Sequence, residues 1–287
     1  MAETPTDAAQ PVPLSRSAAD QFGRWGSGLI LAGCIGFIGE RLWQLEPAGL
    51  LDQASWSLGA ALLATPVLFG AADVALARGW QVLADPEARL GKRAAAAIYG
   101  RGVLMKYLPG SVFQYVSRQF GGASAGLEHR QLAKASVAEI GLHVAASMTV
   151  AAGCLIAVQQ PLLAGAAALG VIAATVTGRR PLLRALGCQL IAFSGFAAAA
   201  AVVGAAVLPA GAALAQFAAL FLLAWLAGFV IPVAPGGLGV REAALLALAA
   251  GTMPAPALLA AVLALRIGSV LGDLGYGLFT QWRSRSR

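Results

Sequence analysis

Eight ionisable side chains fall inside segments that are otherwise apolar, and they are the residues of this sequence most able to do chemistry. They are Asp73, Arg118, Glu139, His143, Arg241, Glu242, Arg266 and Asp273. A lone Arg or Asp at the centre of a membrane helix costs about 2.5–3.5 kcal/mol, so several lipid-facing charges would cancel a typical folding stability. We therefore expect them to face one another or a wet cavity. Two interpretations stay open: ion pairs that lock a helix bundle, or a functional polar pocket.

Helical spacing groups some of these residues into two polar stripes. The first stripe follows steps of three and four: Ser136, Glu139, His143 and Ser147. The second lies on the last apolar segment: Arg266, Ser269 and Asp273. Residues at these spacings share one helix face, so the stripes could meet in the protein interior. Glu139 and His143 could then relay a proton, although a hydrogen-bonded interior histidine is the alternative for His143.

Two Pro-Gly runs interrupt the apolar segments and place arginines just after a helix break. The residues of the two breaks are Pro109, Gly110, Pro235, Gly236, Gly237 and Gly239. The second break predicts a new helix over 238–250, with Arg241 and Glu242 in its first turns. At membrane depth, a broken helix must be buried in protein or line a wet cavity. The free N–H groups at the helix start, with Arg118 and Arg241 as further donors, suit an anion such as a lipid phosphate. A break that merely lets helices pack closely is the alternative.

The composition indicates that these residues lie in a membrane. Apolar residues are 59% of the chain, charged residues 11%, and the mean hydropathy is +0.75, whereas soluble domains carry about 25% charged residues. A spanning helix needs about 20 mostly apolar residues. The candidate spans are 25–44, 56–78, 134–158, 162–178, 184–208, 213–232 and 256–280. With 238–250 as an eighth crossing, the sequence predicts an all-α polytopic integral membrane protein.

The positions of the basic clusters predict how the protein is oriented in the membrane and whether segment 93–120 crosses it. Cytoplasmic loops of membrane proteins carry an excess of Lys and Arg. Here the basic clusters follow Arg78, Arg118, Arg179 and Arg283. Placing all of them on the cytoplasmic side of a bacterial inner membrane requires 93–120 to enter and leave on the same side, as a re-entrant hairpin.

This topology puts both termini in the cytoplasm. Residues 1–20 are expected to form a disordered tail, and residues 21–287 a single transmembrane domain. The two Pro-Gly segments echo each other, which would fit an inverted repeat with a site at its interface. A chance match of a common dipeptide is the alternative.

Sequence motifs of catalysis and metal binding are absent. The chain has no Gly-x-x-x-x-Gly-Lys, His-Glu-x-x-His or Gly-x-Ser-x-Gly motif. The two histidines lack the carboxylate spacing of a zinc site, and the three cysteines lack CxxC spacing. The net charge of +7 comes from residues between apolar segments, which does not favour nucleic acid as a partner. We therefore expect no cofactor, no metal and no enzymatic activity.

The second break, with the Lys106-Tyr-Leu-Pro-Gly110 run and Arg118 upstream, resembles the lysylphosphatidylglycerol synthetase transmembrane-region family, or flippase-like domain. Ala135 to Glu139 and Arg266 are also similar to that family's pattern. Members join this domain to a soluble aminoacyltransferase or a glycosyltransferase, and we expect neither here. The resemblance implies the lipid-translocating part alone. It does not imply one substrate, since members are tied to aminoacylated phospholipids, polyprenyl-linked sugars and other lipids.

These observations lead to a hypothesis of lipid translocation between leaflets. Three arginines would contact the headgroup phosphate: Arg118, Arg241 and Arg266. Three acids would balance them or contact a cationic headgroup: Glu139, Glu242 and Asp273. Asp73 is a weaker candidate. A membrane subunit that positions a separate lipid-modifying glycosyltransferase or aminoacyltransferase is the main alternative, and an integral-membrane transferase is a third.

Overall fold

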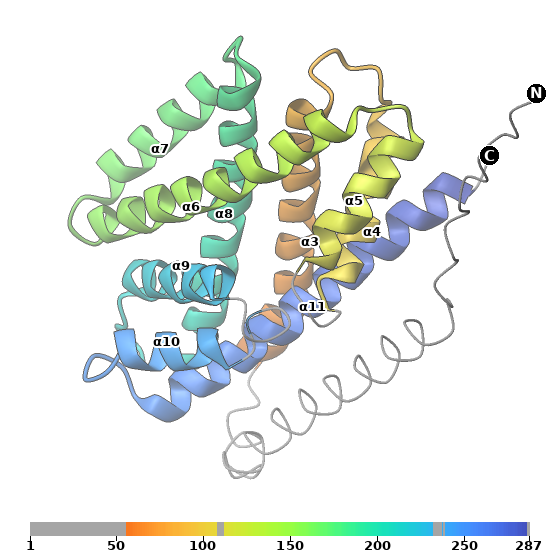
Figure 1. The fold of residues 1–287 in the computed structure, drawn as a ribbon. Helices are drawn as coiled ribbons and strands as arrows, with labels where there is room; N and C mark the ends of the chain where they lie inside the picture. The colour runs from red at the N-terminus through yellow and green to blue at the C-terminus, as the bar shows by residue number, and fades with distance from the viewer. Residues whose placement is uncertain (1–55, 108–111, 232–236, 238, 286–287) are drawn as a thin grey trace, which may run out of the picture.

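The computed structural model describes residues 56–107, 112–231, 237 and 239–285 (Figure 1). Every regular element in this part of the chain is a helix, which confirms the all-α prediction for it. The helices are α3 (Trp56–Ala84), α4 (Lys92–Met105), α5 (Phe113–Ser124), α6 (His129–Gln159), α7 (Pro161–Val176), α8 (Pro181–Val207), α9 (Leu214–Val230), α10 (Val240–Leu248) and α11 (Ala255–Arg285). The expected tail at 1–20 and the expected span at 25–44 lie outside the described residues.

Four of these helices are long and apolar enough to cross a membrane: α3, α6, α8 and α11. Two further apolar helices, α7 and α9, are shorter, with 16 and 17 residues. Large apolar side chains such as Leu63, Val67 and Leu162 lie exposed on the outside, while several charged side chains are buried. This distribution is the one expected of a membrane protein. Eight crossings stay a prediction, because α10 has only nine residues.

Segment 93–120 forms two helices, α4 and α5, instead of one spanning helix. The helices pack against each other in antiparallel directions: Gly102 of α4 lies against Gln114 of α5, and Ile98 lies against Gly121. The connection includes Pro109 and Gly110, which are outside the described residues. A helical hairpin with its break in the expected place is therefore present, and its re-entry into the membrane stays a prediction.

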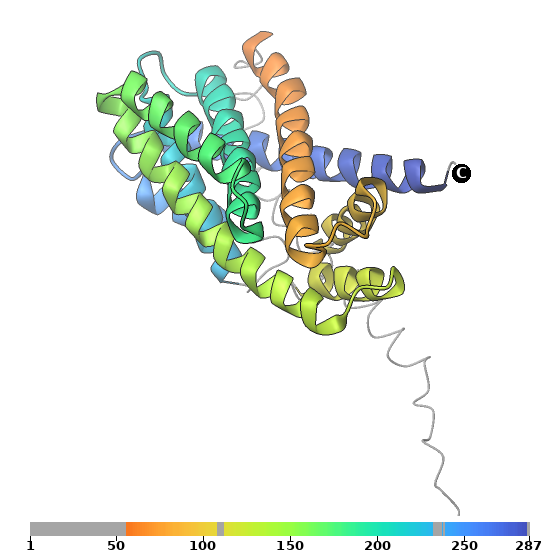
Figure 2. The ribbon, with the colours of Figure 1, turned by 90° about the horizontal axis from the view of Figure 1, so that it is seen from above.

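Close helix contacts at small residues organise the bundle around α3. Helix α8 runs antiparallel to α3, with Gly79 against Ala185 and Gly195 against Ala72. Helix α11 crosses α3 obliquely, α9 lies on the side of α8 away from α4, and α6 runs past α8 and α3 to α5 (Figures 1 and 2). Small residues let helix backbones approach closely in membranes, where dispersion contacts replace the hydrophobic effect as the driving force.

The crossing of α3 and α11 depends on glycine at position 272. A Cβ atom there would lie 2.7 Å from the carbonyl oxygen of Pro66 and 2.8 Å from the Cβ of Phe69. Both neighbours belong to the α3 backbone or its first side-chain atom, so neither can move without shifting the helix. Nothing lies within 4 Å of a Cβ built at Gly275, three residues further along the same helix.

Gly272→Ala is therefore expected to lower the free energy of unfolding by about 1–3 kcal/mol, the usual cost of forcing atoms into a packed contact. Gly275→Ala is the matched control, and it should be neutral or stabilise by up to about 1 kcal/mol because alanine is the better helix former. Thermal unfolding in detergent micelles, followed by circular dichroism, measures both. Equal stability of the two variants would contradict this packing.

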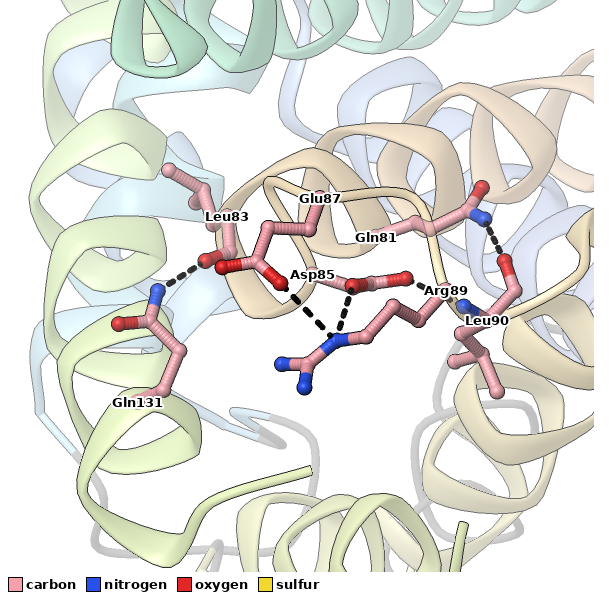
Figure 3. A network of polar contacts seen from close by, with 7 residues as sticks. All are labelled: Gln81, Leu83, Asp85, Glu87, Arg89, Leu90 and Gln131. Carbon is pink, nitrogen blue, oxygen red and sulfur yellow. Dashed lines mark hydrogen bonds and ion pairs between the residues drawn. The ribbon is translucent and has the colours of Figure 1, made fainter. Parts of the chain in front are cut away.

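A polar network fixes the connection between α3 and α4. Figure 3 shows its members, Gln81, Leu83, Asp85, Glu87, Arg89, Leu90 and Gln131. The buried carboxylate of Asp85 accepts a hydrogen bond from the backbone N–H of Leu90 at 2.5 Å, and Gln81 donates to the carbonyl of Leu90 at 2.7 Å. Gln131 of α6 donates to the carbonyl of Leu83 at 2.7 Å. The network satisfies backbone groups where α3 ends, and so holds the start of α4 against α3 and α6.

Candidate functional site

A cavity of about 390 Å³ lies between the helices and brings most of the predicted site residues together. We call it the central cavity. Its charged and ionisable lining residues are Asp73, Tyr99, Lys106, Tyr107, Tyr115, Arg118, His143, Arg241, Arg266 and Asp273. They come from α3, α4, α5, α6, α10 and α11 and the segment after α4. The volume lies within the range of about 300–1,000 Å³ typical of small-molecule sites.

Described residues on either side of the two Pro-Gly runs line this cavity. Tyr107 and Val112 flank the first break, Val230 and Gly237 flank the second, and all four line the central cavity. The break residues Pro109, Gly110, Pro235 and Gly236 are outside the described residues. Gly237 and Gly239 are described and have φ angles of +71° and +80°, which other residues rarely adopt. Helix α10 begins directly afterwards, at Val240.

Arg118 and Glu139 form a buried ion pair on one wall of the cavity. The Nη1 atom of Arg118 lies 2.7 Å from Oε2 and 2.9 Å from Oε1 of Glu139. Arg118 is 4% exposed and Glu139 is 1% exposed, so removal of either partner would leave an uncompensated charge in a poorly solvated place. The pair joins α5 to α6. It agrees with the expectation that Glu139 balances an arginine.

Aromatic rings enclose this ion pair. The guanidinium carbon of Arg118 lies 4.7 Å from the ring centroid of Tyr99 and 4.9 Å from that of Tyr115. The hydroxyl of Tyr99 also donates a hydrogen bond to Glu139 at 3.1 Å. Gly102 makes room for the arginine, because a Cβ there would lie 2.9 Å from Cγ of Arg118. Arg118 therefore combines an ion pair with two cation–π contacts, which favour arginine over lysine.

His143 lies on the same face of α6, in an aromatic cluster. Its Nδ1 atom is 2.9 Å from the backbone carbonyl oxygen of Glu139, one helical turn earlier. Its ring stacks on Phe229, at a centroid distance of 5.2 Å, and on Trp225, at 6.0 Å. The structure therefore shows His143 as a hydrogen-bonded interior histidine that also lines the central cavity. Its contact with Glu139 is to the backbone, and a proton relay through the pair stays a prediction.

Asp273 forms an ion pair with Lys106, which was not among the predicted site residues. The Nζ atom of Lys106 lies 2.6 Å from Oδ2 of Asp273, and the hydroxyl of Tyr107 donates a hydrogen bond to the same oxygen. Asp273 is buried on α11, while Lys106 and Tyr107 directly follow α4. Asp73 of α3 is also buried at this end of the cavity. These contacts tie the first Pro-Gly break to α11.

Arg241 lies in a slot formed by two glycines and an indole ring. A Cβ on Gly228 or on Gly237 would overlap the Arg241 side chain. The guanidinium carbon lies 5.0 Å from the ring centroid of Trp225. The Nε atom is enclosed and has no hydrogen-bond partner among the described residues. An enclosed donor without a partner is costly unless a ligand or water meets it.

Glu242 points into a second, smaller cavity of about 30 Å³, which adjoins the central one. Arg241, Arg266 and Ser269 line both cavities, whereas Glu242 lines only the smaller one. Its Oε2 atom is enclosed, with no hydrogen-bond partner among the described residues. Arg241 and Glu242 thus share the smaller cavity, and only Arg241 also reaches the central one.

Three arginines from three different helices, α5, α10 and α11, therefore line one cavity. The predicted site residues did not include Lys106 or the aromatic lining residues, which are Phe69, Tyr99, Tyr107, Tyr115, Phe196, Trp225 and Phe229. Lys106 and Tyr107 stand two or three residues before Pro109, and this proximity to the break was a usable signal. The aromatic residues gave none, since such residues are common in apolar helices.

Chemically, the central cavity is suited to an anion attached to an apolar or neutral group. Arginine and lysine donate charge-assisted hydrogen bonds to phosphate or carboxylate oxygens, and the aromatic rings offer apolar contact beside them. Among the described residues, no group of three or more His, Cys, Asp or Glu side chains could hold a metal ion.

In comparisons with models of protein families, with curated proteins and with solved structures, nothing matches this chain. The resemblance to the lysylphosphatidylglycerol synthetase transmembrane-region family therefore stays a prediction.

Proposed function

We propose that this protein moves a lipid with an anionic headgroup between the two leaflets of a membrane. The observation that carries the proposal is the convergence of Arg118, Arg241 and Arg266 on one cavity inside a bundle of apolar helices. Burying such charges is expensive, and a phosphate that binds between them offsets part of that cost.

The contacts of Arg118 and Arg241 favour a phosphate-binding site over a cluster of purely structural ion pairs. Arg118 is held by Glu139, so its side chain is already positioned. Arg241 has an enclosed Nε donor without a described protein partner, which leaves hydrogen-bonding capacity for a ligand. A cluster of ion pairs that only locked the bundle would pair each cation with a protein acid.

The surface of α5 fits a lipid path beside the cavity. Its large apolar side chains Phe113, Val116 and Phe120 are exposed, while Arg118 points inward. An amphipathic helix of this kind places its apolar face against lipid tails while its polar face lines the cavity. In this arrangement the headgroup crosses through the cavity and the acyl chains remain in the bilayer.

Reconstitution tests the proposal directly. The purified protein in proteoliposomes is expected to move phosphatidylglycerol that carries a fluorescent group on one acyl chain, measured as the fraction accessible to a membrane-impermeant quencher over time. Protein-free liposomes provide the background. Phosphatidylcholine with the same acyl label, whose headgroup has no net charge, should move more slowly because its ammonium group opposes the arginines. Unchanged accessibility relative to protein-free liposomes would contradict the proposal and favour a non-transporting membrane subunit.

A further inference from the structure

Two buried carboxyl groups line the central cavity, and only one of them has an ion-pair partner among the described residues. Asp73 of α3 and Asp273 of α11 are each 3% exposed, and both line the cavity. Asp273 is engaged by Lys106 and Tyr107. Both acids lie near the crossing of α3 and α11, where a Cβ on Gly70 would lie 3.5 Å from the carbonyl oxygen of Gly272. The Oδ2 atom of Asp73 is enclosed and has no hydrogen-bond partner among the described residues. Two carboxylates near each other in a poorly solvated place oppose each other's ionisation.

The charges of the two adjoining cavities balance only while the site is empty. The basic groups are Lys106, Arg118, Arg241 and Arg266; the acidic groups are Asp73, Glu139, Glu242 and Asp273. The remaining titratable groups are neutral in their usual forms: His143 and the tyrosines 99, 107, 115 and 276. Helices α8 and α9 add aromatic and apolar side chains to the lining of the central cavity but no charged ones. With all acids and bases ionised the charges cancel, so a bound phosphate would leave one negative charge in excess.

We propose that Asp73 takes up one proton when an anionic headgroup binds in the central cavity, so that phosphate and proton occupy the protein together. This inference rests on the proposed function. The proton comes from the bulk solution, where the buffer gives it up, and it stays on the carboxyl group of Asp73, which can then donate a hydrogen bond to Asp273. No other bond changes. The added proton restores neutrality and removes the repulsion between the two carboxylates.

Asp73 is the site of protonation because the other acids have cations beside them. Glu139 is paired with Arg118, and Asp273 with Lys106. Glu242 lines the smaller cavity together with Arg241 and Arg266. Asp73, by contrast, forms no ion pair within the described part of the chain, and its enclosed Oδ2 atom has no hydrogen-bond partner there. Since binding and protonation are linked, each must favour the other by the same factor.

The experiment measures protons and lipid binding on the same sample. Purified protein in a maltoside detergent, weakly buffered at a series of pH values with a pH-indicator dye, is titrated with short-chain phosphatidylglycerol. At pH values where Asp73 is ionised in the free protein, we expect uptake of about one proton for each lipid bound and an affinity that weakens about tenfold per pH unit. Asp73→Asn should bind lipid without proton uptake, and its affinity should not change with pH.

Two variants keep the outcome interpretable. Asp73→Glu retains a carboxyl group and should restore proton uptake, which a purely structural role of Asp73 does not predict. Glu87→Gln, on the exposed connection after α3, removes an acid outside both cavities and should behave as the unsubstituted protein. Lipid binding without proton uptake, or equal uptake in Asp73→Asn, would overturn this inference and leave the proposed function standing. Absence of saturable phosphatidylglycerol binding would overturn both.

Discussion

Glu139→Ala is expected to lower the free energy of unfolding by about 3–5 kcal/mol, because it removes one partner of a buried ion pair. The reason is the environment of Arg118, which is 4% exposed and has its ion-pair partner at 2.7 Å. Without Glu139, the guanidinium group keeps its charge in a poorly solvated place, and the hydroxyl of Tyr99 loses its acceptor. Denaturant or thermal unfolding in detergent micelles measures the loss.

The double variant Arg118→Met/Glu139→Leu separates this explanation from simple loss of packing. It removes both charges and retains apolar volume, so we expect it to be more stable than Glu139→Ala and to recover most of the lost stability. Glu128→Ala, at the solvent-exposed start of α6, is the matched control and should change stability by less than about 0.5 kcal/mol. A double variant no more stable than Glu139→Ala would contradict the buried-charge explanation.

Arg241→Ala is expected to slow translocation of phosphatidylglycerol by about 10- to 100-fold while leaving the protein folded. A hydrogen bond to a charged group is worth about 1.5–3 kcal/mol, and each 1.4 kcal/mol is a factor of ten. The side chain lies between Gly228 and Gly237 over Trp225, with an enclosed donor that has no partner among the described residues. The quencher assay in proteoliposomes measures the rate.

Two further variants control for charge and for folding. Arg241→Lys keeps the charge, but lysine lacks the planar donor pair and stacks less well on the indole ring. Its translocation rate should therefore lie between those of the unsubstituted protein and Arg241→Ala. Arg283→Ala removes an exposed arginine from the last turn of α11 and should translocate normally. If Arg241→Ala and Arg283→Ala transport equally fast, Arg241 has no part in headgroup binding.

The helices could be read from the sequence because membrane helices are specified locally. Runs of apolar residues predicted α3, α6, α8 and α11, and most of the predicted helix ends lie within about five residues of the observed ones. The break before α10 and the division of 93–120 followed from Pro and Gly, which act on their own backbone. The burial of Glu139, His143 and Ser147 followed from their spacing on one helix.

The ion-pair partners of the charged residues could not be predicted from local sequence. The sequence did not indicate that Asp273 would form an ion pair with Lys106. That pairing depends on where α4 ends relative to α11, and this position is set by contacts of Gly100 and Gly277 with the opposite helix. Neither Asp273 nor its neighbours in sequence indicate how α4 is positioned along α11.

By itself, therefore, the sequence determined that this is a helical membrane protein with buried charges near two helix breaks, because apolar length, helical period and Pro-Gly backbone limits are all local. Only the tertiary structure decided that Arg118, Arg241 and Arg266 line one cavity. It also decided that Asp73 and Asp273 line the same cavity and that Lys106 pairs with Asp273. These contacts are made by helices far apart in the chain, whose crossing points depend on how closely small residues let their backbones approach.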